Sequence, residues 1–402
     1  MLQLYQRRKS KIGEIMKVLK ILMLQIMVGT MALSFSGQPD WSTVAVYDNK
    51  IPENIVMNIK YPEHPEVLDY IFIRSRTANL RDEPSTQGKI IGKYPYDTKL
   101  KAIEKVLNYG NLWYYVEDSQ GNRGYISANV ARKRVFRFQK AMDKIAELEK
   151  FIQSQRELGR EVISTNSYVP NPNNQNFKRQ KDKYGTSLDQ SSIGKSVVDG
   201  EEIYIPDRAI LSVIEKGEKT SRIKVASIPE ELIVDNSTLS RNPKIQNEFS
   251  KVVAIDVANQ NMMVFEKNSE DIWEVISYVY SKTGIESKLG FETPKGFFIS
   301  PLAKYIMPYN SEIGEKEGYA RYAIRFSGGG YLHGTPINYD EEINKEFFMK
   351  QKEKTLGTFT GTRKCIRTTE GHARFLFNWV VEKPNNNYNE QRPTENVMFI
   401  IF

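Results

Sequence analysis

Short strand-like runs separated by turns fill residues 70–134, and they restrict the possible folds more than any other feature of the sequence. Runs such as Lys89-Ile-Ile-Gly-Lys-Tyr94 and Leu112-Trp-Tyr-Tyr-Val116 are punctuated by turn sequences, among them Asp82-Glu-Pro-Ser85 and Ser119-Gln-Gly-Asn122. Frequent turns between short strands are typical of a small β-barrel. We therefore expect a mainly β chain with some helix and with a small barrel in this region.

The rest of the chain divides into segments of different composition. In residues 135–160, apolar side chains recur at steps of three and four, which predicts an amphipathic helix that Gly159 can stop. Residues 161–196 are rich in Asn, Gln, Ser and Lys, which predicts a flexible polar linker. Short β-like runs predict a β-rich intermediate segment in 197–250, to which the sequence gives no function. Strand-like runs then resume, and 251–402 is expected to be the last domain.

The N-terminal residues 1–37 have the pattern of an export signal. Basic residues precede an apolar run that ends in small residues, with the membrane-directed part in 17–36. The apolar run is shorter than the ~20 residues that a spanning helix prefers, which favours a cleaved signal peptide over an anchor in the cytoplasmic membrane. Translation can start at Met1 or at Met16. Either way we expect an exported protein of the periplasm or cell wall.

Charge and cysteine content exclude several kinds of site. The 402 residues include 57 basic and 49 acidic side chains, and the net charge of +8 is spread along the chain. The sequence shows no nucleic-acid-binding motif, so we expect no nucleic-acid partner. A single cysteine cannot form an internal disulfide or a cysteine-based metal cluster, and no spacing of zinc ligands is present. We expect neither a metal nor an organic cofactor.

The only cysteine, Cys365, is a candidate nucleophile. A thiol reacts as the thiolate, which nearby positive charge favours, and Arg363, Lys364 and Arg367 flank it. A threonine that follows, Thr368 or Thr369, can cap a helix whose N-terminal dipole also favours an anion. The sequence therefore predicts a reactive thiolate.

Three histidines are present, and His333 is the preferred base. It follows the glycine-rich turn Gly328-Gly-Gly-Tyr331 and precedes Gly334 and Thr335, so a strand end can present its imidazole beside a tight backbone. His372 lies within the predicted helix among apolar neighbours, which favours a structural role. His64, in a proline-flanked segment, is expected to be a solvent-exposed bystander.

Residues 70–134 resemble a bacterial SH3 domain. The resemblance rests on Ala78-Asn-Leu-Arg-Asp-Glu-Pro-Ser85, Trp113-Tyr-Tyr-Val116 and Gly124-Tyr-Ile-Ser127. It implies a module that binds the cell wall or positions a partnered enzyme. Two functions remain open for its aromatic side chains, which can form a contact surface or fill the barrel: Tyr109, Trp113, Tyr114 and Tyr125.

Residues 251–402 resemble the L,D-transpeptidase catalytic domain of the YkuD/ErfK type. The resemblance rests on Thr293-Pro-Lys-Gly-Phe-Phe-Ile299, Tyr331-Leu-His-Gly-Thr-Pro336 and Gly361-Thr-Arg-Lys-Cys-Ile-Arg-Thr368. It implies a β-sandwich or barrel-like domain that cross-links peptidoglycan stem peptides through a thioester on Cys365, with His333 as general base. The same resemblance implies that a neighbouring oxygen, from Gly334 or Thr335, holds the second imidazole nitrogen.

The loop before the nucleophile departs from the family pattern. Many members have Ser/Thr-His-Gly where this chain has Thr362-Arg363-Lys364. The candidates for the oxyanion site or for substrate binding are these three residues together with Gly334, Thr335 and Arg367. The interval between His333 and Cys365 is also long, and its extra segment 338–355 is expected to be helical or lid-like. Two alternatives remain: hydrolysis of the same stems by an L,D-carboxypeptidase or amidase, and a non-catalytic wall-binding scaffold.

Overall fold

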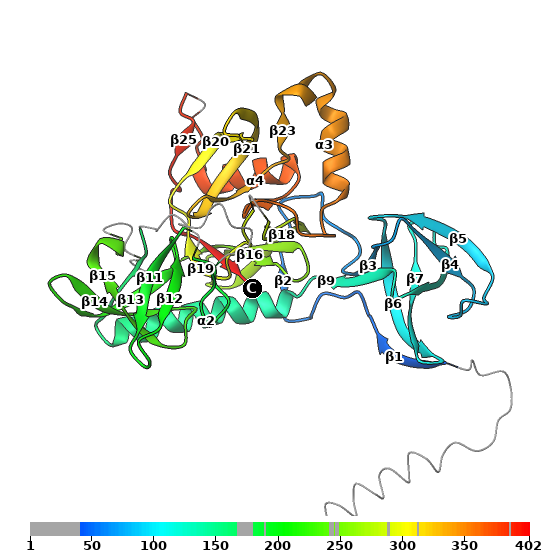
Figure 1. Cartoon of the computed structure of the whole chain (residues 1–402), viewed down its shortest axis with the longest axis horizontal. Coiled ribbons are helices and arrows are strands. Elements are labelled where there is room, and N and C mark those ends of the chain that lie inside the picture. The colour runs from blue at the N-terminus through cyan, green and yellow to red at the C-terminus, as the bar shows by residue number, and fades with distance from the viewer. Residues whose placement is uncertain are drawn as a thin grey trace, which may run out of the picture. The chain divides into compact units, whose positions relative to one another are not determined.

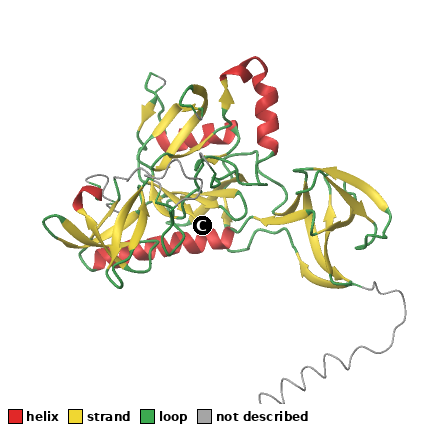
Figure 2. Cartoon of the chain, in the orientation of Figure 1, coloured by secondary structure: helices red, strands yellow, loops and turns green. Residues whose placement is uncertain are grey.

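The computed structural model describes residues 41–166, 180–188, 190–240, 245, 249–287, 290–311, 313–385 and 387–402. The strands of these residues form four sheets, and residues 43–402 make up one compact unit (Figures 1 and 2). The predicted mainly β class is confirmed, but the sheets are open and do not close into barrels. The predicted leader 1–37 lies outside the described residues. None of the helices in the described ranges is long and apolar enough to cross a membrane.

The first sheet is the SH3-like module. Its strand order is β5-β4-β8-β7-β6-β3-β9, and β1 also pairs with β6. The bounds are β1 (Ser42–Val46), β3 (Asp69–Ile73), β4 (Thr77–Arg81), β5 (Ile90–Pro95), β6 (Lys99–Asn108), β7 (Asn111–Glu117), β8 (Arg123–Ser127) and β9 (Ala131–Val135). Alternate residues point inward, as in β4, where Ala78 and Leu80 are buried. They join a small core of their own, to which Ile71, Val116 and Ile126 also belong.

The four aromatic residues singled out in this module divide between the two expected functions. Trp113 and Tyr114 are buried and serve packing. Tyr109 is 83% exposed, and Tyr125 is half-buried with its ring 4.9 Å from that of Tyr115. Only the second pair remains available for contact with another molecule.

The catalytic region is built around a sheet that is covered on both faces. Its order is β19-β26-β16-β17-β18-β2, with β2 (Val56–Met57), β16 (Lys251–Asp256), β17 (Asn261–Lys267), β18 (Trp273–Tyr280), β19 (Gly296–Ile299) and β26 (Val397–Ile401). All six residues of β16 are buried. Val252 and Ala254 pack toward α2, whereas Val253 and Ile255 belong to the core on the opposite face. A strand buried on both faces reads as a continuous apolar run, as this one does.

The helix α2 (Phe138–Glu157) covers one face of this sheet (Figure 1). Its buried side chains repeat at helical spacing: Phe138, Ala141, Ile145, Leu148 and Ile152. Gly159 follows the helix at φ +67°, and its N–H donates to Arg156 O at 2.8 Å. A left-handed residue just after the last turn is the ordinary way to end a helix.

The second catalytic sheet carries the candidate site. Its order is β24-β22-β21-β20-β25, and β23 also pairs with β21. The bounds are β20 (Ala303–Asn310), β21 (Lys316–Ser327), β22 (Gly330–His333), β23 (Ile337–Asn338), β24 (Ile366–Arg367) and β25 (Glu390–Gln391). Between this sheet and β16 lies α4 (Glu370–Val381), which buries Leu376, Phe377 and Val380. Two further elements form the insertion, η2 (Tyr339–Asn344) and α3 (Lys345–Lys354).

The fourth sheet combines two strands from the segment expected to be a linker, 161–196, with four strands from the segment expected to be β-rich, 197–250. Its order is β10-β13-β14-β15-β11-β12, with β10 (Glu161–Ser164), β11 (Ser191–Ser196), β12 (Glu202–Pro206), β13 (Ile210–Lys216), β14 (Thr220–Val225) and β15 (Glu231–Asp235), followed by η1 (Asn236–Thr238). The segment 161–196 therefore begins and ends in strands, because its polar residues pair with apolar strands from 202–235. The predicted linker residues 167–179 and 189 lie outside the described residues.

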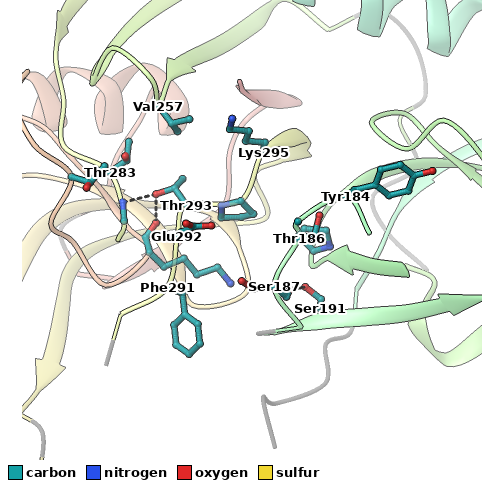
Figure 3. Close-up of a pocket in the computed structure, with 16 residues that line it drawn as sticks. Tyr184, Thr186, Ser187, Ser191, Val257, Thr283, Phe291, Glu292, Thr293 and Lys295 are labelled. Atoms are coloured by element: carbon teal, nitrogen blue, oxygen red, sulfur yellow. Dashed lines mark hydrogen bonds between the residues drawn. The ribbon is translucent and has the colours of Figure 1, made fainter. Parts of the chain in front are cut away.

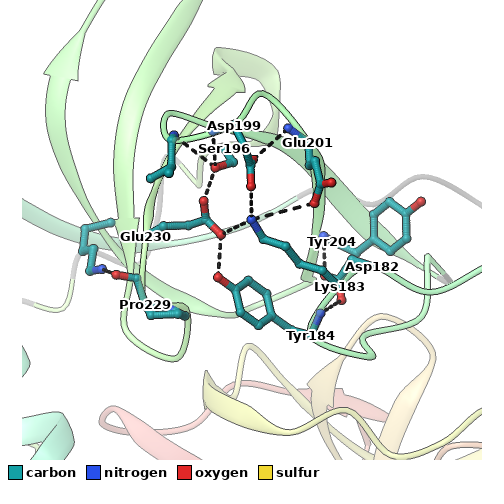
Figure 4. Close-up of polar contacts among 11 residues, drawn as sticks. Asp182, Lys183, Tyr184, Ser196, Asp199, Glu201, Tyr204, Pro229 and Glu230 are labelled. Atoms are coloured by element: carbon teal, nitrogen blue, oxygen red, sulfur yellow. Dashed lines mark hydrogen bonds and ion pairs between the residues drawn. The ribbon is translucent and has the colours of Figure 1, made fainter.

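An ionic cluster lies beside two neighbouring strands of this fourth sheet, β11 and β15. The Lys183 ammonium lies 2.5 Å from Asp199 and 2.9 Å from Glu230, and the Tyr184 hydroxyl donates to Glu230 at 2.5 Å (Figure 4). These contacts tie residues 182–184 to the turns that follow β11 and precede β15.

Candidate active site

Strand pairing brings the two principal candidates together. β22 and β24 are parallel neighbours with Leu332 opposite Ile366 and His333 opposite Arg367. Leu332 and Ile366 are fully buried, so the alternation of side chains places His333 and Cys365 on the other face. Cys365 stands two residues before the partner of His333. Ideal strand spacing and the rise of two residues correspond to about 8 Å between their Cα atoms.

The His333 ring is held in one tautomer. Its Nδ1 lies 2.6 Å from the Gly334 carbonyl oxygen, which can only accept, so Nδ1 carries the proton and Nε2 has a free lone pair. Burial lowers the pKa of His333 to about 4, with the Gly334 hydrogen bond opposing this shift and Arg367 adding to it. The imidazole is therefore neutral at neutral pH and able to accept a proton.

The Cys365 thiol is half-buried, and its pKa is raised rather than lowered. Burial is the largest cause, and the Tyr331 N–H and the Lys364 charge oppose it without overcoming it. Sγ lies 3.9 Å from the Gly329 carbonyl oxygen, a weak thiol contact. The sequence expectation of a preformed thiolate does not describe this thiol, because the surrounding protein removes more hydration than the basic neighbours replace.

Lys364, just before the nucleophile, has an unusual backbone. Its φ is +108°, a region that side chains other than glycine adopt at a cost of about 1–3 kcal/mol. The side chain is buried, and Nζ donates to Gly328 O at 2.5 Å and to Gln190 Oε1 at 3.2 Å. The lysine thus occupies a position shaped for glycine, and its ammonium is engaged with the turn before β22.

The Lys364 backbone is held in place by the side chain of Thr293. The Thr293 hydroxyl donates to Lys364 O at 2.7 Å and accepts from Gly284 N–H at 2.8 Å (Figure 3). A Cβ on Gly284 would lie 2.7 Å from Lys364 Cα and 2.3 Å from Phe291 O, so only glycine fits there. A pocket of about 350 Å³ lies beside Thr293. Its lining includes Gly284, Thr293, Lys364 and residues within 184–206, but not Cys365.

The side chains of two other loop candidates, Arg363 and Thr362, are bonded to backbone or carboxylate groups of the protein. Arg363 is exposed; Nη1 donates to Asn310 O at 2.8 Å, and Nη2 lies 3.5 Å from a Glu317 carboxylate oxygen. The Thr362 hydroxyl donates to the Cys365 carbonyl oxygen within the loop. Both residues shape the loop, while the backbone N–H groups beside Cys365 remain the candidates for an oxyanion.

Arg367 and Thr335 connect the site to the insertion. Arg367 Nη2 donates to Lys352 O at 3.2 Å and to Thr355 Oγ1 at 2.9 Å, and burial lowers its pKa to about 10. The Thr335 hydroxyl donates to Glu353 Oε1 at 2.7 Å. The insertion was expected to be helical or lid-like. It is helical, and the C-terminal end of α3 is hydrogen-bonded to Arg367 of β24 and to Thr335, which follows β22.

The other histidines have partners away from the thiol. His372 is fully buried in α4, with Nε2 3.0 Å from Ser277 Oγ and Nδ1 3.3 Å from Thr368 Oγ1, and burial lowers its pKa to about 3. Thr369 caps α4 by accepting from His372 N–H at 3.3 Å. His64 is half-buried, not fully exposed as expected, and contacts the Tyr278 hydroxyl at 2.8 Å.

Sequence reasoning missed three residues that support the site: Gln190, Gly284 and Thr293. Thr293 lies in a quoted motif, but nothing in its spacing indicated that it would hold the nucleophile loop. Gln190 lies within the predicted linker, and its contact with Lys364 joins residues 174 positions apart. As for metals, no cluster of three or more potential ligands among His, Cys, Asp and Glu occurs within the part of the chain that the structure describes.

Comparisons with known proteins agree with this architecture. Residues 76–130 match the model of the bacterial SH3 domain, and residues 250–386 match that of the L,D-transpeptidase catalytic domain. A comparison with curated proteins finds no match.

Among solved structures, an L,D-transpeptidase from Mycobacterium smegmatis is similar at 12% identity, covering 50% of this chain and 71% of that one, with a TM-score of 0.27. L,D-transpeptidase 3 from Mycobacterium tuberculosis is similar at 13% identity, with 52% and 79% covered and a TM-score of 0.26. A fused Zn-dependent amidase/peptidase/peptidoglycan-binding domain-containing protein from Clostridium acetobutylicum has 13% identity, 38% and 52% coverage and a TM-score of 0.24. The assignment rests on the two family matches: the chain carries a bacterial SH3 domain followed by an L,D-transpeptidase catalytic domain.

Proposed function

We propose that this protein cross-links peptidoglycan stem peptides, with Cys365 as nucleophile and His333 as general base. The observation that supports this most directly is the pairing of β22 with β24, which sets the one cysteine diagonally across from a neutral histidine of fixed tautomer. The matched catalytic-domain family supplies the substrate class.

The proposed reaction begins with both groups neutral. His333 Nε2 takes the thiol proton as Sγ attacks the carbonyl carbon between the diamino acid and the terminal D-alanine of a donor stem. Backbone N–H groups beside Cys365 meet the oxyanion. When the tetrahedral intermediate collapses, the imidazolium returns its proton to the departing amine, which leaves as D-alanine. A thioester remains on Cys365.

The second half of the reaction repeats these steps with another amine. The side-chain amine of an acceptor stem attacks the thioester and gives a proton to His333. Collapse of the new intermediate expels the cysteine sulfur, which recovers its proton. The product joins the third residues of two stems, and the chemistry requires neither a metal nor an organic cofactor. If water replaces the amine, the same site is an L,D-carboxypeptidase or amidase.

The proposal extends to where the protein acts. The two matched domains suggest an exported protein, and the partners we propose are stem peptides at the catalytic site and the cell wall at the SH3 domain. Of the four aromatic residues singled out on that module, the exposed Tyr109 and the half-buried Tyr125 are the ones we propose for wall contact.

Purified protein incubated with defined tetrapeptide muropeptides tests the function. We expect dimers and free D-alanine in the mass spectrum, and neither from the Cys365→Ala variant. Shortened tripeptide stems without dimers identify a hydrolase. No product from the wild-type protein, together with wall-fragment binding that Cys365→Ala retains, supports the scaffold and ends the catalytic proposal.

A further inference from the structure

The segment that leads into the nucleophile loop is held by the SH3 domain. Three carbonyl oxygens of this segment accept hydrogen bonds from SH3-domain side chains. Lys99 Nζ donates to Lys354 O at 2.8 Å, and the Tyr70 hydroxyl donates to Gly357 O at 2.8 Å. Arg134 Nη2 donates to Thr358 O at 2.9 Å. We call residues 354–360 the docking segment.

An aromatic side chain of the docking segment completes this contact. The Phe359 ring stacks on Tyr96, with centroids 5.3 Å apart and planes 10° from parallel. It also meets Phe72 edge-on, at 4.8 Å and 82°. Phe72 is fully buried, whereas Tyr96 is 49% exposed. Two aromatic side chains of the SH3 domain therefore contact a ring of the same chain.

The opposite side of the docking segment is bonded to the catalytic domain. Gly357 N–H donates to Ser281 O at 2.9 Å, and Gly361 N–H donates to Thr283 O at 2.9 Å. The Thr355 hydroxyl oxygen accepts from Arg367 Nη2 at 2.9 Å and from Lys282 Nζ at 3.0 Å. The segment is thus enclosed between the two domains, only a few residues before the nucleophile.

Gly357 shows how closely the domains approach each other. Its φ is +78°, and a Cβ there would lie 2.7 Å from the Tyr280 ring and 2.9 Å from the Tyr70 hydroxyl oxygen. There is no room for a side chain between the SH3 domain and β18. A shift of either domain must therefore be felt by the docking segment.

We propose that the SH3 domain positions the nucleophile loop of its own catalytic domain by holding the docking segment. Tyr96, Phe72 and Lys99 are positioning residues, since they act on Cys365 and Arg367 through the docking segment. The effect on turnover rests on the proposed function. The effect on the geometry of Cys365 does not, because thiol reactivity can be measured without a substrate.

The test compares Tyr96→Ala with Tyr115→Ala in the full chain. Tyr115 pairs with Tyr125 within the same SH3 domain, so its loss removes a similar ring contact away from the docking segment. Cys365 is the only cysteine, so the rate of iodoacetamide labelling reports on this thiol alone. Tyr96→Phe keeps the stacked ring. Lys99→Met removes the hydrogen bond to Lys354 O and the ammonium 5.1 Å from the Tyr280 ring centroid, but leaves the Tyr96–Phe359 stack in place.

We expect labelling of Tyr96→Ala to be faster than that of wild type by roughly two- to tenfold, the equilibrium factor of one aromatic ring pair. With muropeptides, we expect kcat to fall about tenfold while KM changes little, because a small misplacement of the reacting groups slows chemistry more than binding. Lys99→Met should shift both quantities in the same direction. Tyr96→Phe should restore wild-type values, and Tyr115→Ala should retain them.

Equal labelling rates for Tyr96→Ala, Lys99→Met and Tyr115→Ala, with each variant folded by thermal unfolding, would overturn the inference. If the wild-type protein gives no product from muropeptides, the proposed function fails. The labelling rates still decide whether the SH3 domain positions the thiol.

Discussion

The resting state of the Cys365 thiol is the most direct prediction from the site. An ordinary cysteine pKa near 8.5 leaves about 3% thiolate at pH 7, and the pKa of Cys365 lies above its ordinary value because the thiol is buried. Iodoacetamide reacts with the thiolate. We therefore expect the labelling rate near neutral pH to be at most about 3% of its alkaline plateau.

His333 should have little influence on that profile. Burial lowers its pKa to about 4, so the imidazole is neutral from about pH 5 upward and contributes no positive charge to stabilise a thiolate. A raised thiol pKa means that the reactive form is present only at high pH and is lost as the pH falls. We expect one sigmoidal rise for the wild-type protein, and a His333→Asn profile within about twofold of it.

Mass spectrometry of the carbamidomethyl adduct across a pH series measures both profiles, and no other cysteine competes. A plateau of reactivity between about pH 5 and 8 that disappears in His333→Asn would refute the reasoning, because only a thiolate–imidazolium pair behaves so. If the neutral pair is observed, proton transfer belongs to the attack on substrate. The free protein then holds no standing ion pair.

Three further predictions concern the structure around the thiol. Burial lowers the pKa of His372 to about 3, so the folded state binds fewer protons than the unfolded state below about pH 6.5. The free energy of unfolding of the wild-type protein should therefore fall by about 2 kcal/mol between pH 7 and pH 5 because of this residue. Urea unfolding of His372→Gln should show a fall that is smaller by this amount. Gly284→Ala should lower the free energy of unfolding by about 1–3 kcal/mol and slow turnover, because its Cβ would clash with Phe291 O and the Lys364 backbone. Gly92→Ala is the control: its Cβ lies 3.4 Å from the nearest atom, so neither quantity should change. Similar unfolding and turnover in both variants would contradict this. The free energy of unfolding of Lys364→Gly should be about 1 kcal/mol higher than that of Lys364→Met, because both variants lose the ammonium but only glycine adopts φ +108° without strain. Equal free energies of unfolding would mean that the loop stores no strain.

Local sequence patterns predicted the parts of the fold that depend on local physics. The buried stripe of α2 follows from apolar spacing, and the start of α4 follows from a threonine before an apolar helix. The placing of Cys365 near His333 required more than spacing, because β22 and β24 are parallel and distant in sequence. The family resemblance supplied that relation.

The features that the sequence could not supply depend on contacts between distant segments. A Ser-rich strand such as β11 reads as linker until its partner β12 is known. Lys364 reads as a surface charge, yet the turn at Gly328 and the side chain of Gln190 bury it. For the same reason the pKa of the Cys365 thiol is raised where the sequence predicted that it would be lowered. Flanking charges can be read from a sequence, whereas desolvation by burial cannot.

The order of strands in the central catalytic sheet sets a demand on how the chain folds. β16 pairs in parallel with β26, with Ala254 opposite Ile400. This pairing can form only after the ribosome has synthesised the whole catalytic domain. At one edge of the same sheet, β18 pairs in parallel with β2, which lies between β1 and β3 in the sequence. The long chain segments between these paired strands must close before the strands can form hydrogen bonds, which slows folding. Until then the apolar β16 is exposed to solvent. A fragment that begins at Lys251 would lack β2 and leave the edge of β18 open, so aggregation of that fragment is the expected cost of excising the catalytic domain.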